Sequence, residues 1–202
     1  MSDRGCSPPP IETAAQKRVL WIALLLNAVM FVVEVTTGIL VNSAGLVADG
    51  LDMLSDAAVY AVALIAIGSS LRFKANAAMV SGLVLLALGI GLIVEVVRRF
   101  FEGGTPDGVW MIAVSVVALA VNVVVLRLLS QQRSDEVHMR AAWIFTRADV
   151  IANGAVILSG IAVLLTGLRQ FDLAVGAAIG AYVVREAFEI IGEARVAKRA
   201  AN

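Results

Sequence analysis

Six apolar stretches follow one another along this chain, and each is long enough to cross a lipid bilayer as a helix, which takes about 20 residues. They cover residues 19–41, 44–69, 77–98, 109–129, 141–167 and 171–191. Between them lie a tight turn at Asn42-Ser43, polar loops at 72–76 and 130–140, and a turn cluster at 103–107. The pattern predicts an all-α membrane protein whose single transmembrane domain, residues 18–192, has six transmembrane helices.

The two ends of the chain are polar. Residues 1–17 contain Pro8, Pro9 and Pro10 and no apolar core, which predicts a disordered cytoplasmic tail and not a signal peptide. Residues 193–202 are expected to form a short cytoplasmic tail, after a charged helix extension at the membrane surface that includes Arg185, Glu186 and Glu189. No soluble domain is expected on either side.

Composition supports the membrane class and excludes others. Hydrophobic residues make up 60% of the chain, charged residues only 16%, and the mean hydropathy is +0.90. The formal net charge is zero and no basic run interleaved with aromatic residues occurs, which argues against nucleic-acid binding. Cys6 is the only cysteine, so an intrachain disulfide and a multi-thiolate metal site are both excluded.

Basic residues predict the orientation, because lysine and arginine collect on the cytoplasmic side of a membrane protein. The N-terminal tail, the second and fourth loops and the C-terminal end together hold Arg4, Lys17, Arg18, Arg72, Lys74, Arg127, Arg133, Arg140, Arg185, Arg195, Lys198 and Arg199. The odd-numbered loops hold only Arg98, Arg99 and Arg169. Both termini are therefore expected in the cytoplasm, in a multi-pass protein of a bacterial inner membrane.

Several acidic residues lie inside the apolar stretches, where an ionised group costs about 2.5–3.5 kcal/mol at mid-bilayer. They are Glu34, Asp49, Asp52, Asp56, Glu95 and Asp149. At 100° per residue the three aspartates of the second stretch fall within an arc of roughly 60°, so one helix face carries all three. Glu95 lies one turn from Arg98 and Arg99, and an interfacial ion pair and a functional role both remain open for it.

Like charges on one helix face need a shared positive partner, which can be an arginine, protons or a metal ion. Arg147 is the nearest arginine, but it lies on a different face from Asp149 and close to the inner surface. At 1.5 Å per residue, Asp52 and Asp56 lie ~12 and ~18 Å below the outer face, and Asp149 lies ~18 Å below it. These depths permit a joint site.

Such a site would exchange metal for protons, because both bind the same carboxylate oxygens. Oxygen ligands suit Mn²⁺, Fe²⁺, Co²⁺ and Zn²⁺ better than Cu⁺. If the site opens alternately to each side of the membrane, the competition is itself an exchange mechanism.

The sequence resembles the cation diffusion facilitators over residues 18–192. The residues that carry the resemblance are the segment 42–56 with its D-x-x-D-x-x-x-D pattern, Asn27 and 30–34 in the first stretch, and 138–143, 147–149 and Asn153. The resemblance implies a transporter and no enzyme, with no prosthetic group. It also implies efflux of a divalent transition metal (Zn, Co, Cd, Fe or Mn) in exchange for protons, and a homodimer.

By position, the resemblance makes Asp52, Asp56 and Asp149 the metal ligands. Phe145 stands where relatives commonly place a histidine or aspartate, so Asp49, Asn153 or water is left to complete the shell. His138 is more readily explained as a surface residue than as a ligand.

A second departure from the family is that relatives commonly carry a cytoplasmic C-terminal metal-sensing domain, and this sequence ends before one. Any dimer is then expected to be held mainly by transmembrane helices. The small residues at 176–180 permit close helix approach, either within the bundle or between subunits.

Two other functions compete with metal efflux. A proton-coupled exporter of organic cations would need an aromatic-lined cavity, whereas Trp21, Trp110, Trp143, Tyr60 and Tyr182 are scattered along the chain. A non-transporting scaffold or sensor would leave the intramembrane carboxylates unexplained.

Overall fold

The computed structural model describes residues 14–65, 70–131 and 137–200, with side chains over 17–65, most of 70–130 and 149–199. Every secondary-structure element in these ranges is a helix, which confirms the all-α prediction. The helices are α1 (Ala14–Leu40), α2 (Ala44–Ile65), α3 (Leu71–Glu102), α4 (Gly108–Gln131), α5 (Val137–Thr166) and α6 (Gln170–Ala200).

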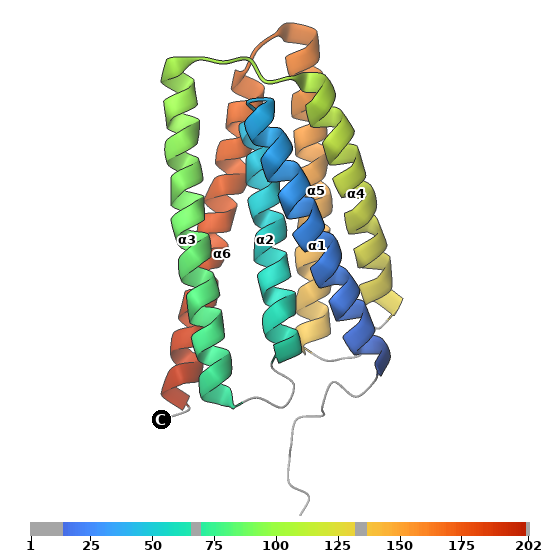
Figure 1. Cartoon of the computed structure of the whole chain (residues 1–202), viewed down its shortest axis with the longest axis vertical. Coiled ribbons are helices and arrows are strands. Elements are labelled where there is room, and N and C mark those ends of the chain that lie inside the picture. Colours follow the sequence, from blue (N-terminus) through green and yellow to red (C-terminus); the bar gives the residue numbers. More distant parts are fainter. Residues whose placement is uncertain (1–13, 66–69, 132–136, 201–202) are drawn as a thin grey trace, which may run out of the picture.

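Four of these helices contain segments long and apolar enough to cross a membrane: Lys17–Leu40, Ala75–Glu102, Gly108–Ser130 and Asp149–Thr166. The helices α2 and α6 are not among them, and both carry charged residues within their length. The start of α1 and the end of α6 lie at the same end of the bundle (Figure 1). This arrangement requires an even number of crossings, as a six-span topology has, and that topology stays a prediction.

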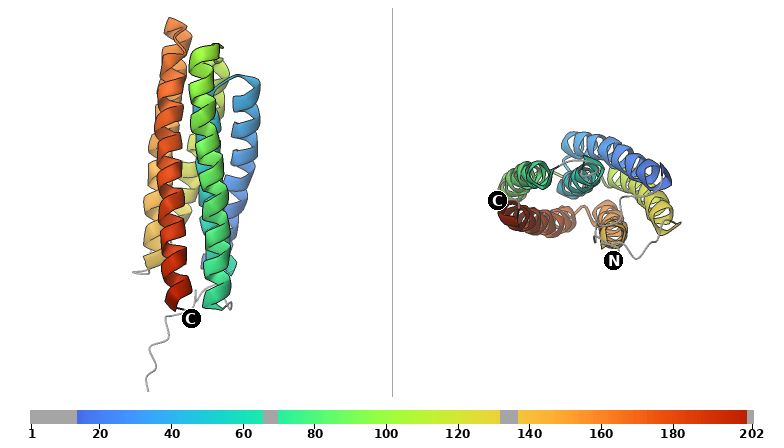
Figure 2. Two further views of the ribbon diagram at one scale, coloured as in Figure 1. Left: turned by 90° about the vertical axis from the view of Figure 1, so that its left-hand side faces the viewer. Right: turned by 90° about the horizontal axis from the view of Figure 1, so that it is seen from below.

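The helix α2 lies at the centre of the bundle and touches all five other helices (Figure 2). Small residues make this possible: a β-carbon added at Gly50 would come within 2.8 Å of Val35 Cγ2, and one added at Gly176 would come within 2.8 Å of the Ala44 backbone. A β-carbon added at Gly180 would likewise come within 3.0 Å of Leu92 Cδ2 in α3. The small residues at 176 and 180 therefore serve helix packing within the chain.

Apolar clusters surround the middle of α2. One cluster joins residues of α2, α3, α4, α5 and α6, including Leu46, Leu92 and Val183. A second joins α1, α2 and α4 around Leu20, Tyr60 and Val125. A third consists of Met30, Met53 and Ala118. The buried polar groups of α2 therefore lie within a well-packed apolar bundle, away from bulk water.

The turns agree with the sequence, whereas the helix ends do not. Asn42 has a left-handed φ of 57°, and Gly103 and Gly104 have φ of 94° and 116°, as the predicted turns require. The predicted loop at 72–76 is wrong, because α3 already begins at Leu71 after Ser70, whose Oγ accepts a hydrogen bond from Phe73 N at 3.3 Å. Polar residues continue the helices beyond the apolar span, so a change in hydropathy does not mark a helix end.

The same effect shortens the predicted loop at 130–140 and extends the helices into the predicted N-terminal and C-terminal tails. The helix α4 continues to Gln131 and α5 begins at Val137, while residues 132–136 lie outside the described part. The helix α6 continues to Ala200, so most of the segment 193–202, predicted as a tail, is helical. The predicted tail at 1–17 becomes helical from Ala14, and residues 1–13 lie outside the described residues.

Asp172 in the first turn of α6 holds the start of α2. Its carboxylate accepts hydrogen bonds from Ser43 Oγ (2.7 Å), Ala44 N (2.7 Å) and Gly45 N (2.9 Å). These backbone N–H groups have no partner within α2 itself, because the first four donors of any helix lack one. A residue about 130 positions further along the chain therefore caps the central helix and fixes its position.

We expect Asp172→Ala to lower the free energy of unfolding by about 1–3 kcal/mol, since three buried donors lose their acceptor. Unfolding of the detergent-solubilised protein in increasing SDS measures this. Asp107→Ala is the matched control, because the exposed Asp107 carboxylate caps α4 through Val109 N (2.9 Å) and Trp110 N (3.3 Å). Equal effects of the two substitutions would contradict the role given to Asp172.

Candidate cation site

The three aspartates of α2 all lie inside the bundle. Asp49, Asp52 and Asp56 are buried, as is Asp149 of α5, and none exposes more than 4% of its surface. The single face deduced from their spacing is therefore the face that α2 turns toward its neighbours.

The inner part of the site joins α2 and α5. Asp149 contacts both Asp52 and Asp56 through its carboxyl group, and its Oδ2 receives no hydrogen bond from any described donor. The Tyr60 hydroxyl lies 3.5 Å from Asp56 Oδ2. The structure thus brings the three residues predicted as metal ligands to one level of the bundle, as the depth calculation permits.

One helical turn nearer the N-terminal end of α2, a second group of polar residues surrounds Asp49. Asn153 Nδ2 donates to both Asp49 oxygens, at 2.9 Å and 3.0 Å. Glu34 of α1 contacts the same carboxyl group. Asp49 and Asn153, which were predicted as alternative ligands, therefore contact each other.

The predicted place of Glu186, in a charged extension at the membrane surface, is wrong. In the structure Glu186 is buried between α6 and α2, and its Oε2 accepts a hydrogen bond from Ser55 Oγ at 2.9 Å. It also interacts electrostatically with Asp52 and Asp56. Its helical spacing from the buried apolar residues Ile179 and Val183 was the available signal.

No ion pair with Asp49, Asp52, Asp56 or Asp149 is formed among the described side chains. The ion pairs found there lie elsewhere: Glu95 binds Arg98 (2.6 Å) and Arg99 (2.9 Å), Glu102 binds Arg98, and Glu189 binds Arg185 (2.9 Å). Glu95 thus forms ion pairs with Arg98 and Arg99, one of the two interpretations that the sequence left open. The side chains of Arg147, Phe145 and His138 lie outside the described part of the structure.

The carboxylates approach one another in pairs. Within the described residues, no three histidine, cysteine, aspartate or glutamate side chains are close enough to hold one metal ion. A cation shared by Asp52, Asp56 and Asp149 would therefore have to draw their oxygens closer together. Mutual repulsion of the ionised groups opposes that movement, and a bound divalent cation reverses the balance.

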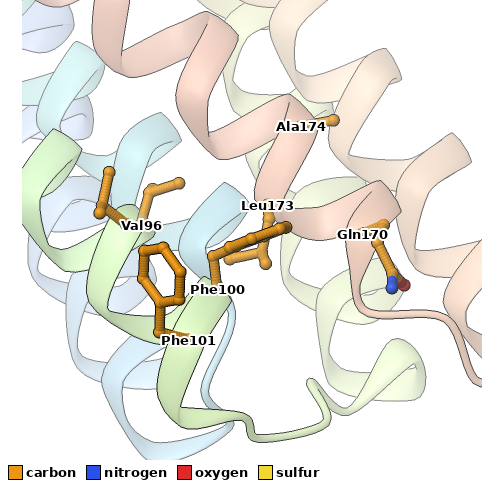
Figure 3. A pocket seen from close by; sticks show the side chains of 7 residues that line it. Val96, Phe100, Phe101, Gln170, Leu173 and Ala174 are labelled. Atoms are coloured by element: carbon orange, nitrogen blue, oxygen red, sulfur yellow. The ribbon is translucent and has the colours of Figure 1, made fainter.

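An apolar groove on the surface is a separate feature. It lies where α3 ends and α6 begins, lined by Val96, Val97, Phe100, Phe101, Leu173, Ala174 and Gln170 (Figure 3). Gln170 is its one polar side chain, so this groove has no ligand set for a cation.

Comparison with known proteins decides which family this bundle represents. A family model described as the cation efflux transmembrane domain matches residues 20–197. The chain belongs to this family. The resemblance seen in the sequence is thereby confirmed, and the chain is an integral membrane domain of the cation efflux type, a family of transporters.

Characterised relatives include three bacterial proteins. The metal cation efflux system protein CzcD of Cupriavidus metallidurans is 28% identical over 83% of this chain and 57% of its own length. The zinc transporter ZitB of Pectobacterium atrosepticum is 29% identical over 90% and 61% of the two chains. The cadmium, cobalt and zinc/H(+)-K(+) antiporter of Bacillus velezensis is 26% identical over 87% and 61%. The chain thus spans about three fifths of the length of these relatives.

We expect Asp52→Asn to stabilise the metal-free cation efflux domain at pH 8, because it removes one of several like charges that are buried together. The free energy of unfolding should rise by on the order of 1 kcal/mol, and the unfolding temperature should rise with it. The gain should shrink as the pH falls, since protons then neutralise the wild-type cluster too. Thermal unfolding in detergent measures both effects, with the exposed Asp107→Asn as control. A lower unfolding temperature for Asp52→Asn at pH 8 would contradict the account.

Proposed function

We propose that this chain exports a divalent transition-metal cation from the cytoplasm, across a bacterial inner membrane, in exchange for protons. One observation carries the proposal: Asp149 lies against Asp52 and Asp56 inside the bundle, with no described basic side chain to balance them. Buried carboxylates without a counter-charge need a cation or protons. The family match and the metals named for the relatives, zinc, cadmium and cobalt, support this reading.

We assign Asp52, Asp56 and Asp149 as ligands of the transported ion. Glu186 adds a fourth carboxylate near them, held by Ser55. Asp49 and Asn153 are proposed as further cation-binding groups one turn outward. A site made of oxygens favours divalent ions of the Zn, Co, Cd, Fe or Mn class over Cu⁺.

Exchange follows from competition for the same oxygens. A divalent ion binds the ionised carboxylates, and when it leaves toward the outside, protons neutralise the empty site and remove its repulsion. Protons released to the cytoplasm restore the ionised site for the next metal ion. The cargo and the protons are the substrates, and the chain needs no prosthetic group and acts as no enzyme.

The competing functions gain no support from the structure. Trp21 and Trp110 are exposed, at 60% and 55%, and so do not line an internal cavity for an organic cation. Tyr60 and Tyr182 do approach the site, but as hydrogen-bonding groups for Asp56 and Glu186. A scaffold would leave the buried carboxylates without a role.

We further propose that the transporter works as a homodimer within the bilayer.

We expect proteoliposomes containing the protein and a metal-sensing dye to take up Zn²⁺ or Co²⁺ when a pH gradient is imposed. Asp56→Ala and Asp149→Ala should each lower the rate by at least about tenfold, which is the lower end of the loss seen when even outer-shell groups of metal sites are removed. Asp107→Ala, a change to an exposed acid at the start of α4, serves as the matched control.

Two results would contradict the proposal in different ways. Absence of gradient-driven uptake for every metal in the class would refute metal–proton exchange itself. Normal uptake by the Asp149→Ala variant would leave the activity intact and refute the ligand assignment.

A further inference from the structure

Glu34 is a buried acid whose two carboxylate oxygens receive no hydrogen bond from any described donor. Its side chain is 0% exposed and lies in α1, ~9 Å from the outer end of that helix at 1.5 Å per residue. A buried carboxylate without a donor is costly, and it usually marks a site for a ligand or an ion.

Close packing of α1 on α2 directs Glu34 toward Asp49. A β-carbon on Gly50 would come within 3.1 Å of Glu34 Cβ, so the two helices are closely packed beside these acids. The carboxyl groups of Glu34 and Asp49 are in contact. Both side chains are 0% exposed, so water does not reach them from the surface.

Asn153 completes the group from α5. Its Nδ2 donates to both oxygens of Asp49, while its Oδ1 receives no hydrogen bond from a described donor. Three buried oxygens of this group, two from Glu34 and one from Asn153, are therefore available to a cation. The two carboxylates together carry two negative charges, which balance the charge of a divalent ion, and the amide adds a neutral oxygen. Divalent ions bind oxygen ligands of both kinds.

The helix register separates this group from the inner ligands. Asp49 pairs with Asn153, whereas Asp52 and Asp56 pair with Asp149, four residues earlier in the antiparallel α5. Four residues of helix correspond to ~6 Å along the axis. The two layers thus follow each other along the same interface between α2 and α5.

We propose that Glu34, Asp49 and Asn153 form a second divalent-cation site, one helical turn outward of the site at Asp52, Asp56 and Asp149. This inference rests on the proposed metal transport and adds a stage to it. A cation that leaves the inner layer meets a second set of oxygens before it reaches the outer end of α2. The cation then moves directly from one set of carboxylate ligands to the next. It does not have to pass through apolar surroundings between the two sites.

Metal stoichiometry tests the second site directly. The full chain in lipid nanodiscs is dialysed against Co²⁺, and the cobalt bound per chain is measured by inductively coupled plasma mass spectrometry. We expect two Co²⁺ per wild-type chain, one for Glu34→Gln, one for Asp149→Asn, and none for the double variant. Glu95→Gln is the matched control, because this is the same change at an acid already paired with Arg98 and Arg99, and it should keep both ions.

Folding of Glu34→Gln is checked by its unfolding temperature and its elution volume, and Asn153→Ala provides an independent variant that should weaken the outer site alone. If Glu34→Gln and Asn153→Ala both bind as much Co²⁺ as the wild type, while Asp149→Asn loses an ion, the second site is refuted and the inner site stands. If the wild type binds no Co²⁺, both proposals fail.

Discussion

The burial of several carboxyl groups inside one membrane bundle is the constraint on which the rest of this structure depends. Asp49, Asp52, Asp56 and Asp149 are almost inaccessible to water, and the ion pairs found among the described side chains lie elsewhere, near the end of α3 and on the exposed side of α6. Such an arrangement is unfavourable unless cations occupy the space between the acids. The same features that destabilise the empty site therefore give it affinity for divalent metals and for protons.

The position of α2 determines how this charge is distributed. Small residues let α1 and α6 approach its backbone, and Asp172 caps its first turn from the start of α6. Its aspartates then face different partners at successive depths: Asn153 and Glu34 near the outer end, and Asp149 and Glu186 further in. A helix held this firmly provides a rigid side for the site, so the movement needed to open it is expected in its neighbours.

The sequence alone was sufficient for the helical class and the turns at Asn42 and Gly103, and the depths of the aspartates permitted a joint site of α2 and α5. These features follow from local properties: the period of a helix, its rise per residue and the conformational preferences of turn residues. The aspartates of α2 had to share one face because of their spacing, whichever helix they contacted.

The misplaced or missed features depend on which helices pack together. Glu186 meets Ser55 across 131 positions of the chain, and Asp172 meets Ser43 across 129. No local pattern specifies such pairs, so Glu186 was taken for a surface charge and the contact of Glu34 with Asp49 was not foreseen. The start of α3 was placed too late because polar residues such as Arg72 extend the helix beyond the apolar span.

The proposed function requires the buried carboxylates to exchange protons for a divalent metal ion. Calorimetric titration of the purified chain with Co²⁺, repeated in buffers of different ionisation enthalpy, measures the protons released for each ion bound. We expect proton release that falls as the pH is raised. Both proton release and metal binding should be lost in the variant carrying Asp52→Asn and Asp149→Asn. Binding of Co²⁺ without proton release at any pH would contradict the proposed exchange.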